Sequence, residues 1–331
     1  MHLTDTLLDG SDLLRAYVRD ARAGNTRRAY AAQWQQFATW CGRQGVSALP
    51  ADPRLVAEYL AVRAQAGVAV ASINVTLAAV CFMHKTSGLN FDRTHPILML
   101  VLDGIRRQHV GLQRQAEPLT GRLLAAVLAQ LGEEPADLRD AALLSLLYAF
   151  ALRASEIVAL DWQQLGGGRG WLAVAADRIE IVLLGSKACQ QRAQHVAIPV
   201  AANPRVLAAL LRWLDYAKMA PGEPIVRPLT RGGTIRTSRL DAASVSGIVK
   251  RAMARHLQQV GHDAGVAVRQ ARRFSGHSGR VGLYVSAAEA GVPVQHIAAL
   301  ARHKSLAMAL RYTRQAELLR CAPHARAGVG V

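Results

Sequence analysis

A polar segment without helical or strand periodicity interrupts the chain at residues 108–118. It restricts the folds that the whole chain can adopt. The segment reads Gln-His-Val-Gly-Leu-Gln-Arg-Gln-Ala-Glu-Pro, so it combines glycine and proline with few apolar side chains. Such a composition is typical of a connection between domains. Because a chain of 331 residues also corresponds to about two domains of ordinary size, we predict an N-terminal domain over residues 1–107, a linker over 108–118 and a second domain over 119–331.

Residues 1–107 repeat apolar side chains at helical spacing and lack the alternation that is typical of strands. We expect helices over residues 11–23, 26–41, 53–65, 70–85 and 96–107. Asn25 has the chemistry of an N-cap for the second of these helices, and Asp52 followed by Pro53 has that chemistry for the third. The first domain is therefore predicted to be helical throughout.

Residues 119–331 mix two periodicities. We expect helices over residues 120–132, 137–152, 203–219, 242–260, 277–290, 293–301 and 305–319, and short strands over 171–176, 178–184 and 195–200. The predicted fold class is mainly α with a small β-sheet, made of a helical N-terminal domain and a mixed α+β C-terminal domain.

The chain carries a large positive surplus. Its 40 Lys and Arg residues against 23 Asp and Glu residues leave a formal net charge of +17. Residues 108–331 hold +13 of this surplus, and it is not concentrated in a basic tail. On a chain that is 51% hydrophobic, and so able to form cores, such a charge suggests a polyanionic partner such as nucleic acid.

Several other classes of protein fit the sequence poorly. The four cysteines are far apart and form no C-x-x-C pair, which argues against a zinc ribbon and a disulfide scaffold. The longest mostly apolar run, residues 141–152, is too short to cross a bilayer, and the N-terminus lacks the layout of a signal peptide. The common nucleotide, zinc-protease and serine-hydrolase motifs are also missing from the sequence. We therefore expect a soluble cytoplasmic protein with no membrane partner, no cofactor and no metal.

Two segments of the second domain place cations where they require an explanation. Arg153 follows a strongly apolar helix, where a charge is costly unless it is paired, and Glu156 lies one helical turn away. A structural ion pair explains this arrangement, and so does a functional arginine that Glu156 supports. Lys187 lies in the turn between two predicted strands, where it is either a solvated side chain or a proton donor.

Two later segments add a histidine, an arginine and a tyrosine. His277 and Arg280 are three residues apart at a predicted helix start, so they face the same way beside backbone amides that suit an anion. A capping histidine beside a surface arginine is the alternative. Tyr312 has Arg311 and Arg314 beside it, and nearby positive charge stabilises a phenolate. A packing role for this tyrosine is the alternative.

The order of these residues resembles the catalytic series of the tyrosine recombinases, also called the phage integrase family. The series comprises Arg153, Lys187, His277, Arg280, His303 and Tyr312. The likeness covers about residues 11–315 and includes similar stretches at 51–70 and 83–89. It implies the fold of that family, in which a helical domain binds the core DNA site and a catalytic domain ends in a tail helix. It also implies site-specific DNA recombination.

The resemblance implies how such an enzyme would break DNA. Tyr312 would attack a DNA phosphate and form a 3′-phosphotyrosyl link, leaving a free 5′-hydroxyl. Arg153 and Arg280 would hold the non-bridging oxygens, and Glu156 would support Arg153. Because the bond energy stays in the covalent link, resealing would need neither ATP nor a metal ion.

The remaining members of the series would handle protons and hydrogen bonds. Lys187 would protonate the departing oxygen, His277 would transfer a proton or orient the phosphate, and His303 would donate a hydrogen bond to the phosphate. The family often has Leu-Gly before this last histidine, whereas this chain has Ala301 and Arg302 there. Arg302 thus adds charge and bulk at a position where the backbone usually turns.

The resemblance also implies partners. These are double-stranded DNA with an inverted-repeat recombination site, and further copies of the chain in a homotetramer that passes through a Holliday junction. Candidate DNA contacts are His84, Lys85, Arg106, Arg107, Lys250, Arg251, Arg272 and Arg273. Each of these side chains could equally be part of an ordinary solvated face. The apolar tail after Tyr312 could pack on a neighbouring protomer or on its own.

Two other functions remain open from the sequence. A type IB topoisomerase would use the same nucleophile but would relax supercoiled DNA as a monomer. A non-catalytic DNA-binding regulator on a recombinase scaffold would need none of the cationic series.

Overall fold

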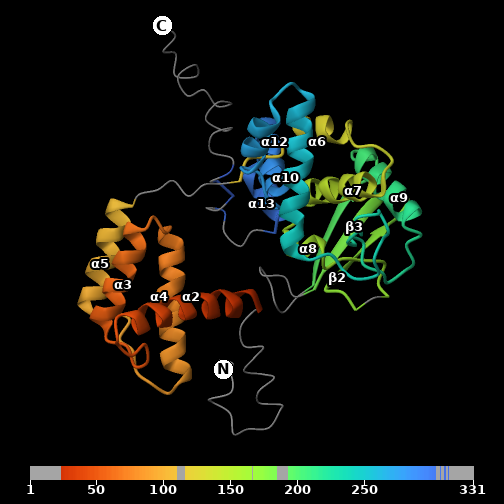
Figure 1. Ribbon diagram of the computed structural model, residues 1–331. Coiled ribbons are helices and arrows are strands. Elements are labelled where there is room, and N and C mark those ends of the chain that lie inside the picture. The colour runs from red at the N-terminus through yellow and green to blue at the C-terminus, as the bar shows by residue number, and fades with distance from the viewer. Residues whose placement is uncertain are drawn as a thin grey trace. The chain divides into compact units, whose positions relative to one another are not determined.

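The structure is a computed structural model that describes residues 24–109, 116–165, 167–184 and 193–302, together with residues 306, 309, 310 and 312. The chain divides into two compact units, Met1–Arg114 and Gln115–Val331, and the division falls inside the segment 108–118 (Figure 1). The described ends of that segment belong to the units on either side. A helix of the first unit continues to Gln108, and the backbone N–H of Glu117 donates to the carbonyl of Arg273 in the second unit at 3.0 Å.

The first unit is helical over its described residues, as predicted. Its helices are α2 (Gly24–Arg43), α3 (Pro53–Gln65), α4 (Val70–Thr86) and α5 (Pro96–Gln108). Asp52 caps α3 by accepting a hydrogen bond from the N–H of Arg54 at 2.6 Å, so the predicted cap is confirmed. The prediction for Asn25 is wrong, because α2 already begins at Gly24 and Asn25 lies inside the helix. The helix expected over residues 11–23 lies outside the described residues.

Aromatic rings join the helices of the first unit. The ring of Tyr59 on α3 lies 5.2 Å from that of Phe37 and 5.1 Å from that of Trp40, both on α2. Such ring pairs add to the apolar area that the helices bury. Leu60, Ile73 and other apolar side chains of the same cluster are fully buried.

The second unit combines helices with a small sheet, which confirms the predicted fold class. Its helices are α6 (Gly121–Leu128), α7 (Pro135–Ala149), α8 (Ala154–Ile157), α9 (Pro204–Tyr216), α10 (Ala242–Gln259), α11 (Ala264–Ala271), α12 (Ser278–Glu289) and α13 (Val294–Leu300). The sheet has the order β1 (Asp161–Trp162), β2 (Gly170–Val174), β3 (Arg178–Leu183) and β4 (Gln194–Pro199). Strands β1 and β2 are parallel, and the other neighbours are antiparallel.

The sequence missed three of these elements, the four-residue helix α8, strand β1 and helix α11. Strand β1 has only two residues and exists through its pairing with β2, so it leaves no pattern of its own. Helix α11 is short, and the signal for it was Asp263, whose carboxylate accepts hydrogen bonds from the N–H groups of Gly265 and Val266.

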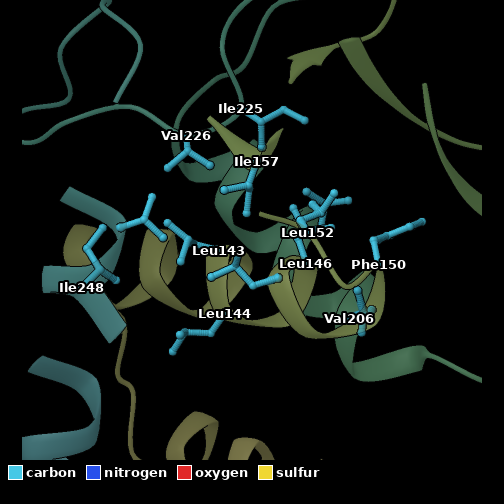
Figure 2. Packing of buried hydrophobic residues seen from close by; sticks show 14 of the residues in the cluster. Leu143, Leu144, Leu146, Phe150, Leu152, Ile157, Val206, Ile225, Val226 and Ile248 are labelled. Carbon is cyan, nitrogen blue, oxygen red and sulfur yellow. The ribbon is translucent and has the colours of Figure 1, made fainter. Parts of the chain in front are cut away.

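Helix α7 lies at the centre of the core of the second unit. Leu143, Leu144, Leu146 and Leu147 are at most 1% exposed. The first three of these side chains point in different directions around the helix (Figure 2). Figure 2 shows Leu143, Leu144 and Leu146 among apolar side chains from other parts of the second unit, among them Ile157, Val206, Ile225 and Ile248. A helix that is apolar on every side has to be covered on every side. The packing of α7 therefore fixes the position of the residues that directly follow it.

Helix α12 packs unusually close to the segment that follows the linker. A Cβ atom on Gly282 would lie 1.8 Å from the carbonyl oxygen of Leu119, and one on Gly279 would lie 3.0 Å from the backbone of Leu147. The N–H of Leu119 also donates to the carbonyl of Ser278 at 3.0 Å. The glycines thus let the start of α12 lie directly beside the end of α7.

Candidate active site

Arg153 is the residue that precedes helix α8, and Glu156 lies in that helix. The Glu156 carboxylate accepts a hydrogen bond from the backbone N–H of Arg153 at 2.9 Å, and its other oxygen lies 2.5 Å from Nη1 of the Arg153 side chain. The Glu156 side chain is 6% exposed, whereas that of Arg153 is 25% exposed. The carboxylate thus fixes a guanidinium that solvent, or an anion, can still reach. The ion pair expected from the sequence is present.

Arg280 extends from α12 into the ends of two other helices. Its Nη1 donates to the carbonyl of Ala151, after α7, at 2.7 Å, and its Nη2 donates to the carbonyl of Ala301, after α13, at 2.5 Å. The residue is 0% exposed. Burial, together with the nearby charge of Arg153, lowers the pKa of Arg280 to about 10, so the side chain stays cationic at neutral pH.

His277 lies immediately before α12 and approaches Tyr312. Its Nε2 is 3.4 Å from the phenolic oxygen of Tyr312, and the two ring centroids are 6.2 Å apart. Burial and the charges of Arg280 and Arg153 lower the pKa of His277 to about 4. The ring is therefore neutral at pH 7 and can accept a proton from the hydroxyl.

Tyr284 is a neighbour of Tyr312 that the sequence reasoning missed. The two ring centroids are 5.3 Å apart, and Tyr284 is fully buried, one helical turn after Arg280 on α12. Burial raises the pKa of Tyr284 to about 12, so this phenol stays neutral. Its contact with Tyr312 restricts the rotation of the latter ring. The spacing of Arg280 and Tyr284 on one helix face was the signal for it.

Arg302 is a second residue whose role the sequence did not reveal. It is 7% exposed, and its Nη2 lies 3.0 Å from the Glu156 carboxylate. The sequence had marked this position only as a departure from the family pattern.

Arg153, Glu156, His277, Arg280 and Tyr312 thus come together around the ends of α7 and α13. Two members of the predicted series, Lys187 and His303, lie outside the described residues, as do the residues after Tyr312. Their roles stay predictions.

The predicted DNA contacts separate into exposed and buried residues. Lys85, Arg106, Arg107, Arg251, Arg272 and Arg273 are exposed, and Lys250 is half-buried. Arg106 lies 2.7 Å from Asp103, and Arg273 forms an ion pair with Glu117. These cations stay candidates for DNA contact.

His84 is not a surface residue, and the prediction that it contacts DNA is wrong. Its side chain is 0% exposed. Nε2 accepts a hydrogen bond from the N–H of Ala51 at 2.8 Å, and Nδ1 lies 2.8 Å from the carbonyl of Val80. Both ring nitrogens are therefore occupied within the first unit. The position next to Lys85 at a helix end suggested exposure, but the ring points into the core.

The described residues contain no cluster of three or more His, Cys, Asp or Glu side chains arranged to hold a metal ion. Within the same parts of the chain, none of the helices has the length and apolar content needed to span a bilayer.

Comparison with known proteins assigns the chain to a family. The model of the "Phage integrase family" matches residues 119–318. The "Integrase/recombinase xerD homolog" of Selenomonas ruminantium is 31% identical over 314 residues, which cover 92% of this chain and 85% of that protein. "Recombinase cre" of Escherichia phage P1 is 24% identical over 292 residues, which cover 84% of this chain and 80% of that protein.

A solved structure has the same fold. The Tn1549 transposon integrase, in complex with transposon right end DNA, superposes with a TM-score of 0.59 at 15% identity, covering 97% of this chain and 100% of that chain. The match to the family model and the 31% identical relative place the chain in the phage integrase family of tyrosine recombinases.

Proposed function

We propose that the chain recombines double-stranded DNA by cutting and rejoining strands through a 3′-phosphotyrosyl link on Tyr312. The observation that carries this proposal is the distance of 3.4 Å between the Tyr312 hydroxyl and Nε2 of His277. The pKa of His277 is about 4, so its ring is a neutral proton acceptor at neutral pH. Membership of the tyrosine recombinase family supports the same reaction.

Each step of cleavage has a group that can perform it. The Tyr312 oxygen attacks the phosphorus, and its proton passes to Nε2 of His277. The bond from phosphorus to the 5′-oxygen breaks, and that oxygen receives a proton from Lys187 in the role that the family resemblance implies. One phosphodiester is exchanged for another, so the reverse attack by a 5′-hydroxyl reseals DNA without ATP.

Cationic side chains provide the electrostatic part of the catalysis. In-line attack concentrates negative charge on the non-bridging phosphoryl oxygens, and fixed cations stabilise it. Arg153 is held by Glu156 with its side chain 25% exposed, which suits contact with one of these oxygens. Arg280 contributes its charge from the buried side of the site. His303 donates a further hydrogen bond in the role that the resemblance implies.

Strand exchange requires two DNA sites and several copies of the chain. We propose a homotetramer on two inverted-repeat sites with a Holliday junction between the two rounds of exchange, as the family resemblance implies. The exposed cations Lys85, Arg107 and Arg272 suit contact with DNA phosphates. A deletion of residues 316–331 that leaves synapsis intact would show that the tail is not required for assembly.

The central test removes the nucleophile while keeping its ring. Tyr312→Phe is expected to abolish covalent protein–DNA adducts and recombination of a two-site plasmid, with DNA affinity within about threefold of the original. Tyr216→Phe, on an exposed face of α9, is the matched control and is expected to retain both activities. Unchanged recombination by Tyr312→Phe would overturn the assignment.

The same assays separate the other functions. Relaxation of any supercoiled plasmid, without recombination between sites, would favour a type IB topoisomerase. Site-specific DNA binding without any adduct from the original chain would favour a regulator. The closeness of His277 and Tyr312 speaks against a regulator, because binding alone does not require a proton acceptor at a phenol.

A further inference from the structure

Arg302 occupies a position that is unfavourable for an arginine on two grounds. Its backbone has a φ of 55°, in the left-handed region that favours glycine. Its side chain is also buried, at 4% exposed. A buried charge requires an opposite charge and hydrogen bonds to compensate for lost hydration. The groups that compensate Arg302 belong to the candidate active site.

The Arg302 guanidinium joins the ends of three helical segments. Its Nη1 donates to the carbonyls of Phe150, at the end of α7, and Leu300, at the end of α13, both at 3.1 Å. Its Nη2 lies 3.0 Å from the Glu156 carboxylate in α8 and 3.4 Å from the carbonyl of Ala151. These helix ends present carbonyl groups that attract a cation.

Glu156 is shared between two arginines. One carboxylate oxygen faces the Arg153 guanidinium at 2.5 Å, and the other faces Arg302 at 3.0 Å. Burial alone would raise the pKa of Glu156, but the charge of Arg302, then the amide and charge of Arg153, lower it below its ordinary value. Among the described residues, Arg280 and His277 also interact electrostatically with Glu156. Arg302 and Arg153 together therefore keep this buried carboxylate ionised.

Arg302 also lies next to the hydrogen bonds of Arg280. The carbonyl of Ala151 accepts from both arginines, at 2.7 Å from Arg280 and 3.4 Å from Arg302. The second acceptor of Arg280 is the carbonyl of Ala301, whose peptide bond leads into Arg302. The left-handed backbone of Arg302 thus helps to set the direction of that carbonyl.

We propose that Arg302 is a positioning residue for DNA cleavage, which holds Glu156 as a carboxylate so that Arg153 is presented to the phosphate, and which orders the carbonyls that hold Arg280. This inference rests on the proposed function. It assigns to the chain a buried third arginine that contacts no DNA.

The test uses two substitutions that differ in backbone strain. Arg302→Gly accepts the positive φ and removes the guanidinium, whereas Arg302→Lys keeps a charge of the same sign. Covalent adduct formation is measured in single turnover at saturating nicked suicide DNA, between pH 5.5 and 8.5, on protein whose folding is checked by circular dichroism. DNA affinity and melting temperature are recorded in parallel.

We expect Arg302→Gly to slow cleavage about 10- to 100-fold at pH 6, because displaced catalytic groups reduce rates by such factors. The deficit is expected to shrink towards pH 8.5 as Glu156 loses its proton, and DNA affinity is expected to stay within about threefold. Arg302→Lys is expected to recover part of the rate. The double variant Glu156→Gln, Arg302→Gly is expected to lack the pH-dependent deficit of Arg302→Gly. Its cleavage rate is expected to be no lower than that of the slower of the two single variants.

Arg227→Met is the matched control. Arg227 is 5% exposed, lies 3.1 Å from Glu223 and donates to the carbonyl of Ala217. It is therefore buried like Arg302 and has the same kinds of partner, a carboxylate and a backbone carbonyl, but it lacks the active-site neighbours of Arg302. It is expected to lower the melting temperature without changing the pH profile of cleavage.

The inference is overturned if Arg302→Gly cleaves at the original rate and with the original pH profile. It is equally overturned if Arg302→Gly and Arg227→Met lose activity only in proportion to lost folded protein. If the original chain forms no adduct on Tyr312, the proposed function itself fails. The two failures are therefore distinguishable.

Discussion

The pKa of His277 allows a quantitative prediction about acid conditions. The difference between an ordinary value of 6.5 and one of about 4 corresponds to about 3 kcal/mol against the charged ring. At pH 5.5, about 97% of rings with the lower pKa are neutral, against about 9% of ordinary histidines. We therefore expect the fraction of neutral His277 rings, which can accept a proton, to fall by less than about 1.1-fold between pH 7.5 and 5.5. The same fraction of an ordinary histidine would fall about tenfold.

The assay has to report the protein without DNA, because a bound phosphate would itself raise the pKa of His277. Cleavage of nicked suicide DNA is therefore followed with DNA far below the KM, since kcat/KM reflects the ionisation of the free protein. Histidine ring signals in the NMR spectrum of the free protein give the midpoint directly, and His277→Gln identifies the His277 signal.

Two results would refute this reasoning. A tenfold fall in kcat/KM between pH 7.5 and 5.5, with an NMR midpoint near 6.5, would show that burial and the two arginines do not suppress the charge. A cleavage rate for His277→Gln equal to the original would show that the ring does not accept the Tyr312 proton.

The same pKa has a consequence for stability. The unfolded chain protonates this histidine near pH 6.5, whereas the folded chain does so only near pH 4. The folded state binds fewer protons in this window, so the pKa difference at His277 reduces the free energy of unfolding, by up to about 3 kcal/mol, as the pH falls through it. His277→Gln is expected to lack this contribution in chemical unfolding curves at pH 7.5 and 4.5.

Three further predictions concern packing, cofactors and DNA. Gly282→Ala places a Cβ at 1.8 Å from the Leu119 carbonyl and is expected to lower the free energy of unfolding by more than about 3 kcal/mol in urea denaturation. Gly247→Ala, whose Cβ would meet only the flexible end of Arg251 at 3.3 Å, is expected to change it by less than about 1 kcal/mol. Recombination is expected to persist in excess EDTA, because arginines stabilise the phosphoryl charge; complete loss, restored by a divalent metal, would contradict this. Arg107→Ala is expected to weaken DNA binding for all sequences and to reduce the slope of log affinity against log salt by about 1, whereas an unchanged slope would exclude a phosphate contact.

Local signals in the sequence predicted much of the fold. Asp52 followed by Pro53 defines a helix start through its own hydrogen bond, so α3 begins where expected. Elements that depend on distant partners escaped prediction. Strand β1 forms because it pairs with β2, so no pattern in the sequence around Asp161 predicts a strand there.

The candidate site shows the same division. The order of cations, histidines and tyrosine along the chain identified residues that the fold brings together, such as His277 and Tyr312. The contacts of each residue in the folded chain could not be predicted from the sequence. His84 stands beside a lysine in the sequence, yet its ring is enclosed by Ala51 and Val80. Arg302 was recognisable as unusual, but its pairing with Glu156 depends on a contact across 146 positions of the chain.

The burial of every residue from 142 to 147 in α7 has a consequence for hydrogen exchange. The amides of these residues reach water only when the surrounding parts of the second unit separate from the helix, so their exchange should require the opening of the whole second unit. Peripheral helices can open alone and should exchange sooner. The peptide groups that lead to Arg153 would then be among the last in the molecule to take up deuterium, which connects the Arg153 guanidinium to the slowest-exchanging part of the chain.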